Sequence, residues 1–103
     1  VAALWAADIY KTPFMAVIFN NQMYNAPKNS TRLGYPDGVS VTTDTWVGVD
    51  INPPPSYATI AQGCRAYGET VTDPNEVLPA LKRGLAQVKQ GKAAVIDVII
   101  DRP

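Results

Sequence analysis

The sequence contains no histidine, a single cysteine and few charged residues. Its 103 residues include nine Lys or Arg and nine Asp or Glu, which gives a formal net charge of zero. Without histidine, Ser-His-Asp and Cys-His catalysis and the two-histidine zinc helix are excluded. Cys64 alone cannot form an intrachain disulfide, which favours a reducing cytoplasm. Because Lys and Arg are not clustered, the sequence gives no indication of a nucleic-acid partner.

Long hydrophobic runs are also lacking. The apolar stretches are far shorter than the roughly 20 residues of a membrane-spanning helix, and no signal-peptide pattern precedes the first strand. We therefore expect no membrane partner. The sequence starts without Met, inside a helical composition that has no capping residue. We interpret residues 1–103 as a single partial domain cut from a longer polypeptide.

Two apolar runs predict the strands of a sheet. Residues 14–19 are six apolar residues in a row, typical of a strand buried on both faces of a parallel sheet. We interpret residues 94–100 as a second continuous apolar strand, long enough to be central, and residues 69–72 as a short strand. Helices are expected at 1–10, from Tyr57 to a stop at Gly68, and from a cap at Asp73 to Gly91. Alternating helices and strands predict an α/β fold with an incomplete parallel sheet.

The spacing of the apolar residues also predicts which helix faces are buried. In the first helix, Leu4, Trp5 and Ile9 are expected to face the sheet. The last helix is expected to bury a stripe of four residues, which are Leu78, Leu81, Leu85 and Val88.

The stretch from 28 to 55 shows neither helical nor strand periodicity for long. Gly and Pro interrupt it repeatedly, and short strands are possible at 39–41 and 46–51. A helical turn at 22–26, closed by Pro27, is expected to precede it. Nearly thirty irregular residues are uncommon in a compact domain unless they have a function. We interpret this stretch as an active-site flap or a subunit contact.

Two asparagines, Asn20 and Asn21, directly follow the first apolar strand. This position is the carboxyl edge of the predicted sheet, where open α/β folds bind ligands. Amide oxygens can serve as ligands of magnesium beside carboxylates and phosphates. Asparagine is also common where a strand ends and a turn begins. The residues alone leave both interpretations open.

The apolar strand, the Asn pair and the following Tyr-containing loop resemble the second half of the thiamine diphosphate signature. That signature opens with Gly-Asp-Gly and closes with Asn-Asn. Residues 2–7, 57–68 and 71–74 also resemble acetolactate synthase-like enzymes. The resemblance covers nearly the whole chain, but the Gly-Asp-Gly half is absent. It implies the C-terminal portion of a three-layer, parallel-sheet thiamine diphosphate-binding domain.

The resemblance also implies roles for individual residues. In that family the second Asn and the carbonyl two residues later bind magnesium, which here implies Asn21 and Met23. Tyr24 and Asn25 would then offer backbone N–H groups to the diphosphate. No residue of this chain takes the role of the family's activating glutamate, so none is assigned as catalytic. The substrate side is implied for two further residues, Ala26 and Pro27.

The implied function is the thiamine diphosphate- and magnesium-binding segment of a 2-keto acid decarboxylase or carboligase. The intact enzyme would be a homo-oligomer, a dimer or tetramer, in which other domains of the same polypeptide complete the site. The 103-residue chain alone is expected to be inactive. The alternative is a non-catalytic α/β interaction module in which Asn-Asn is fortuitous. A Gly-Asp-Gly upstream in the parent gene would decide between the two.

Overall fold

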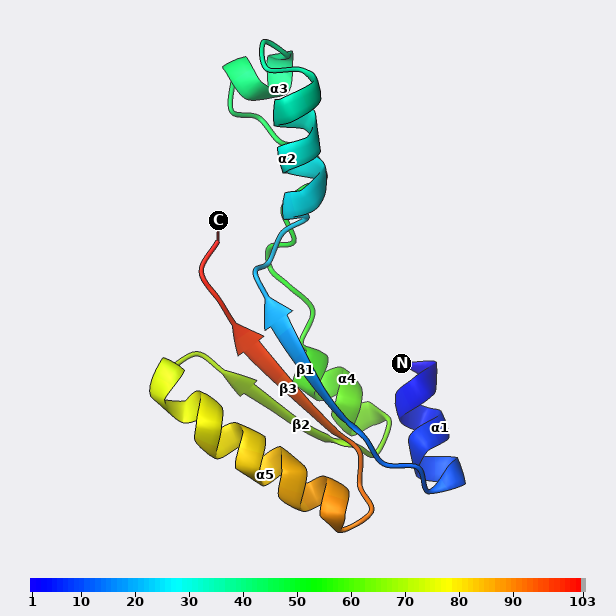
Figure 1. The fold of residues 1–103 in the computed structure, drawn as a ribbon. Coiled ribbons are helices and arrows are strands. Elements are labelled where there is room, and N and C mark those ends of the chain that lie inside the picture. The colour runs from blue at the N-terminus through cyan, green and yellow to red at the C-terminus, as the bar shows by residue number, and fades with distance from the viewer. Residues whose placement is uncertain (103) are drawn as a thin grey trace. The chain divides into compact units, whose positions relative to one another are not determined.

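A computed structural model describes residues 1–102, which form two compact units. The first unit contains residues 1–20 and 55–100. The second contains residues 21–54 together with residues 101 and 102. Helices and strands alternate along the chain (Figure 1), and the predicted α/β class is confirmed.

The first unit is built on a sheet of three parallel strands (Figure 1). These are β1 (Met15–Asn20), β2 (Tyr67–Val71) and β3 (Ala94–Ile99), in the spatial order β1-β3-β2. On β3, Ala94 lies opposite Met15 of β1 on one side and Tyr67 of β2 on the other. The strand predicted to be central is therefore central.

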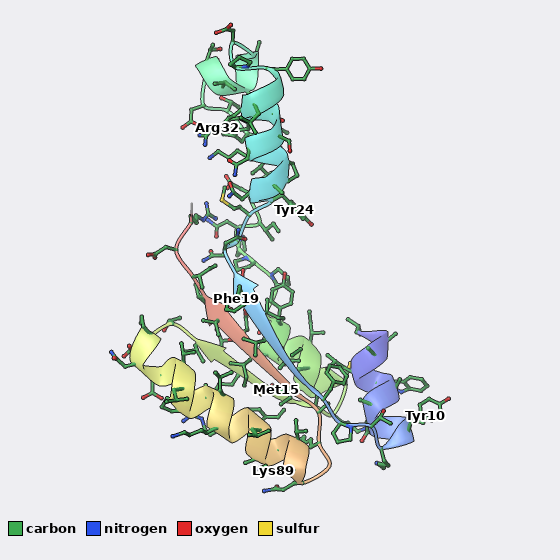
Figure 2. All side chains as sticks on the ribbon, viewed as in Figure 1. Tyr10, Met15, Phe19, Tyr24, Arg32 and Lys89 are labelled. Atoms are coloured by element: carbon green, nitrogen blue, oxygen red, sulfur yellow. The ribbon has the colours of Figure 1, made fainter. Side chains whose placement is uncertain are left out.

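β1 is an edge strand within the part of the chain that the structure describes, so the prediction that it is buried on both faces was wrong. It pairs with β3 alone, and most of its residues are only half-buried. Phe19, near its end, is 73% exposed (Figure 2). An apolar run predicts a strand, but its burial depends on neighbours that the run itself does not specify.

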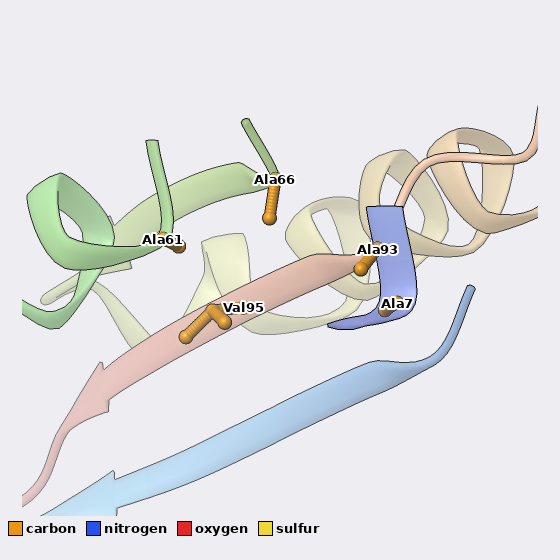
Figure 3. Close-up of a cluster of buried hydrophobic side chains, with 5 residues drawn as sticks. All are labelled: Ala7, Ala61, Ala66, Ala93 and Val95. Carbon is orange, nitrogen blue, oxygen red and sulfur yellow. The ribbon is translucent and has the colours of Figure 1, made fainter. Parts of the chain in front are cut away.

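Helices α1 (Ala2–Tyr10) and α4 (Tyr57–Gly63) pack on one face of the sheet. Leu4 packs against the core on this face as predicted, whereas Trp5 and Ile9 are about half exposed, at 52% and 48%. Alanine dominates the contact, so the helix backbones can approach the sheet closely. Five residues form the buried cluster in Figure 3, which are Ala7, Ala61, Ala66, Ala93 and Val95.

Helix α5 (Val77–Lys89) covers the other face of the sheet. Leu81 packs against this core as predicted, but Leu78 and Leu85 are exposed, at 60% and 45%. Ala80 and Gly84 are the buried residues of this helix instead. The buried stripe thus runs along small residues one turn apart, because α5 lies too close to the sheet for leucines there.

The close approach of α4 to β2 also explains why Gly68 does not end a helix as predicted. α4 ends at Gly63, and Gly68 lies within β2. A Cβ atom at Gly68 would lie 2.2 Å from the Ala58 carbonyl oxygen of α4. The predicted cap at Asp73 is confirmed, because its side chain accepts a hydrogen bond from the Asn75 N–H at the 3₁₀ turn η1 (Pro74–Glu76).

The second unit is more helical than the sequence suggested. It contains α2 (Asn25–Gly34) and α3 (Val39–Thr42), where irregular chain and a short strand were expected. Pro27 lies in the first turn of α2 and does not close a preceding turn, because a residue there needs no N–H. The stretch 46–51 forms no strand, and Asp50 makes an isolated antiparallel bridge with Met23. Within the described residues, no helix is long and apolar enough to cross a membrane.

Replacement of Gly68 by Ala should destabilise the first unit. The added methyl group would overlap backbone atoms of α4, which cannot move as a side chain can. We expect a loss of about 1–3 kcal/mol or more in the free energy of unfolding, measured by denaturant titration. Gly63→Ala is the matched control, since nothing lies within 4 Å of its Cβ position. Equal stability of the two variants would contradict this packing.

A carboxylate on β2 should make stability depend on pH. Glu69 accepts hydrogen bonds from Arg83 Nε at 3.1 Å and from the Tyr67 hydroxyl at 2.6 Å. The Arg83 hydrogen bond lowers the pKa of the Glu69 carboxyl below its ordinary value of 4.5, although burial opposes this. The stabilisation is therefore complete above pH 4.5 and lost as the pH falls through the lowered pKa.

Glu69→Gln should therefore lower the unfolding temperature at neutral pH. Because the wild-type carboxylate becomes protonated in acid, the difference between variant and wild type should stay constant above about pH 5 and shrink below about pH 4. Thermal unfolding followed by circular dichroism across this pH range measures the effect. A difference that grows toward acid pH would contradict the assignment.

Candidate functional site

The carboxyl end of β1 carries a buried polar pair in the first unit. The Asn20 side chain is 6% exposed and donates from Nδ2 to Asp97 Oδ1 at 3.1 Å. The Asn20 carbonyl oxygen accepts from the Ile100 N–H at 3.1 Å. Burial raises the pKa of the Asp97 carboxyl, and the hydrogen bond from Asn20 acts in the opposite direction. Asn20, the first residue of the pair, is thus anchored to β3.

The interpretation of residues 94–100 as a continuous apolar strand overlooks Asp97. It lies in the middle of β3, 2% exposed, between Ile96 and Val98. A carboxylate is almost never fully buried unless it is paired. A single Asp inside an otherwise apolar strand therefore indicates a buried carboxylate with a hydrogen-bond partner, and the sequence shows this pattern.

Asn21 and the two residues after it form a short, hydrogen-bonded segment of the second unit. Asn21 Oδ1 accepts from the Met23 N–H at 3.3 Å, the local arrangement typical of asparagine in turns. Gln22 between them has a positive φ of 56°. Met23 is 8% exposed. The side chain of Asn21 thus folds back onto the backbone of Met23.

The bridge between Met23 and Asp50 determines where the Met23 backbone faces. The neighbouring groups make the hydrogen bonds of this bridge, Tyr24 N–H to Val49 O at 2.8 Å and Ile51 N–H to Gln22 O at 2.9 Å. In such an antiparallel pair, the N–H and C=O of the bridging residue itself point away from the partner. The Met23 carbonyl therefore lies on the same side as the Met23 N–H that Asn21 contacts.

Helix α2 begins immediately after this segment. The resemblance implies that the Tyr24 N–H contacts the diphosphate. In the structure this N–H donates to the Val49 carbonyl oxygen instead. The N–H groups of Asn25 and Ala26, in the first helical turn, have no acceptor within the helix, and Pro27 has no N–H. The first turn carries no acidic residue. This end of α2 can accept an anion, since its backbone dipoles favour negative charge there.

Trp46 holds α2 against the segment that follows α3. Lys28 Nζ and Arg32 Cζ lie 5.3 Å and 5.2 Å from the centre of its ring, within the range of cation–π attraction. The indole N–H donates to Asp44 Oδ1 at 2.7 Å. Figure 2 labels Arg32 on α2 and Tyr24 directly before the helix.

Two cavities of about 260 Å³ each lie beside Trp46 in the second unit. Tyr24 and Pro27, two residues that the resemblance placed at the site, line the first of them. Met23 and Lys28 line the second, together with Asp50. Ala26 lines neither cavity and is exposed.

The residues present fit a magnesium ion that is shared with a diphosphate. Within residues 1–102, no group of three or more His, Cys, Asp or Glu side chains could hold a metal ion. Asn21 and Met23 offer neutral oxygens on one side of their segment. Magnesium takes about six oxygens and commonly combines one or two protein groups with phosphates and waters. These two groups can supply the protein's part of such a set.

A parallel α/β sheet with an amide at the carboxyl end of a strand is typical of a ligand-binding α/β domain. Residues 1–98 match the family described as thiamine pyrophosphate enzyme, C-terminal TPP binding domain. The chain belongs to this family, and the resemblance inferred from the sequence is confirmed. Thiamine pyrophosphate is another name for thiamine diphosphate.

Relatives with assigned activities are sulfoacetaldehyde acetyltransferases. The chain is 31% identical over 86 residues to a probable sulfoacetaldehyde acetyltransferase of Rhizobium meliloti (strain 1021) and to a sulfoacetaldehyde acetyltransferase of Rhodobacter capsulatus. It is 27% identical over 86 residues to the enzyme of Roseovarius nubinhibens. Each match covers 84% of this chain and 13% of the relative.

Proposed function

We propose that this chain is the thiamine diphosphate- and magnesium-binding segment of a 2-keto acid decarboxylase or carboligase resembling acetolactate synthase. One observation carries the proposal. The Asn21 amide and the Met23 backbone share one side of a segment that leads directly into the start of α2. Bound thiamine diphosphate supplies a nucleophilic carbon for attack on a substrate carbonyl, and the protein supplies binding and orientation.

In this proposal Asn21 and Met23 are the magnesium ligands that the chain provides. The amide oxygen of Asn21 already faces the Met23 backbone, held there by the Met23 N–H at 3.3 Å. The Met23 carbonyl is free of the bridge to Asp50 and faces the same side. If magnesium binds here, the Asn21 amide oxygen and the Met23 carbonyl oxygen would be the two neutral oxygens that this segment supplies.

The start of α2 is the proposed diphosphate contact. Asn25 offers its backbone N–H there, and the Tyr24 side chain, 58% exposed, lies beside it. Ala26 and Pro27 are placed on the substrate side. Pro27 lines a cavity of about 260 Å³, large enough for a small keto acid.

The remaining groups of the site would come from elsewhere in the enzyme. The chain spans 13% of the length of the curated relatives it matches. Glu69 and Glu76 both pair with Arg83, so neither is offered as an activating carboxylate. We place the missing ligand and the activating carboxylate in other domains or in a second subunit of a homo-oligomer, a dimer or tetramer located in the cytoplasm.

A second candidate is an acetyltransferase acting on sulfoacetaldehyde, as the names of the relatives state. It is favoured by 31% identity over 86 residues. The two candidates share the cofactor and differ in substrate. Assaying the complete gene product for carbon dioxide release from pyruvate and for consumption of sulfoacetaldehyde separates them. Activity on both that is independent of thiamine diphosphate would contradict the proposal.

Asn21→Ala in the complete gene product should weaken metal and cofactor binding. Loss of one ligand and of its orientation should raise the half-saturating concentrations of magnesium and thiamine diphosphate about 10–100-fold. The KM for the keto acid should change much less. Asn29→Ala, an exposed asparagine on α2, is the control and should leave all three values unchanged. An unchanged cofactor requirement in Asn21→Ala would remove this residue from the site.

The 103-residue chain by itself should not bind the cofactor tightly. Magnesium keeps its waters unless several well-placed oxygens replace them, and the chain offers two. Calorimetric titration of the purified chain with thiamine diphosphate and magnesium tests this expectation. Micromolar binding would mean that the site is complete within these residues.

A further inference from the structure

We propose that Asp97 of β3 is a positioning residue for the cofactor segment. It holds the amide of Asn20, which is joined by one peptide bond to Asn21. The inference rests on the proposed function and extends it to a strand on which neither the motif nor the resemblance places a site residue.

The burial of this pair is unusual for the molecule. Among residues 1–102, Asn20 and Asp97 are the polar side chains that are buried, at 6% and 2% exposure. Their neighbours on the same strand face, Ile18 of β1 and Val95 of β3, are apolar. A buried carboxylate is costly unless it is hydrogen-bonded, and apolar residues of similar size often stabilise a core better. A buried polar pair that costs stability without improving the packing is typical of a functional site.

The pair fixes both the side chain and the backbone at the point where β1 ends. The Asn20 Nδ2 group donates to Asp97, so the amide orientation is set and its oxygen is directed elsewhere. The bond runs diagonally across the ladder, because Asp97 lies opposite Ile18 while Asn20 lies opposite Ile99. The Ile100 N–H holds the Asn20 carbonyl as well. Side chain and main chain of one residue are therefore both bonded to β3.

An edge strand needs such an anchor more than a central strand does. Within the described residues β1 pairs only with β3, and Phe19, one residue before Asn20, is 73% exposed. Strand ends with few buried contacts open locally at low free-energy cost. Opening there would release the residue that precedes the proposed ligand Asn21. The bond to Asp97 opposes this opening at the carboxyl end, where the ligand segment begins.

The test compares four variants of the complete gene product with wild type: Asp97→Ala, Asp97→Asn, Asn20→Ala and the double variant Asn20→Ala/Asp97→Ala. The half-saturating concentration of thiamine diphosphate at fixed magnesium is measured twice, from the rise in unfolding temperature and from activity. Glu69→Gln is the control, because it removes a carboxylate of the neighbouring strand that is bonded to Arg83 and Tyr67. It should lower stability and leave cofactor binding unchanged.

Asp97→Ala should raise the half-saturating cofactor concentration about 10–100-fold, the range typical of residues that orient metal ligands. Asp97→Asn, which keeps an acceptor for Asn20, should restore most of the affinity. The double variant should bind the cofactor no more weakly than the single variant with the lower affinity, because Asp97 acts through Asn20. The KM for the keto acid should remain within about threefold in all of them, since neither residue is proposed to contact the substrate.

Two results would overturn the inference. One is unchanged cofactor affinity in folded Asp97→Ala, or in Asn20→Ala should the first variant fail to fold. The other is a double variant whose half-saturating cofactor concentration rises by the product of the two single fold-changes. That result would mean that the two residues act independently. If wild type itself does not bind thiamine diphosphate, the proposed function fails and the inference with it. If wild type binds thiamine diphosphate and the variants bind it with the same affinity, the inference is overturned and the proposed function is not.

Discussion

The central strand β3 is the constraint on which the first unit depends. It pairs in parallel with β1 and β2, and all of its residues except the last are buried. Its alternating side chains supply both cores, Val95 toward α1 and α4 and Ile96 toward α5. Because parallel strands must be covered on both faces, each residue of β3 has a demanding environment. The helices meet it through alanine and glycine, so the layers lie close together and few substitutions at the contacts can be tolerated.

Asp97 is the exception to this apolar environment. Its hydrogen bond with Asn20 joins the best-buried strand to the end of the edge strand β1. From Asn20 the chain passes into the segment of Asn21 and Met23, which belongs to the second unit. The polar pair replaces apolar packing at the carboxyl end of β1.

The second unit uses a different kind of interaction. Met23 and Val49 are its buried apolar residues. Lys28 and Arg32 of α2 lie over the Trp46 ring, and Asp44 accepts the hydrogen bond of the indole N–H. Cation–π contacts and a bridge of two backbone hydrogen bonds are weaker than a buried apolar core. The second unit therefore depends on polar and cation–π contacts more than the first unit does.

The sequence by itself determined the α/β class, the central position of residues 94–99, the cap at Asp73 and the family to which the chain belongs. These features follow from local periodicity, from capping chemistry and from a contiguous motif, all of which a few neighbouring residues encode. Tertiary structure alone decided that β1 lies at an edge, that Gly84 and not Leu85 is buried, and that Gly68 lies in a strand against Ala58. It also paired Asn20 with Asp97, 77 residues apart. Burial and pairing depend on which distant segments pack together, and no short stretch of sequence contains that information.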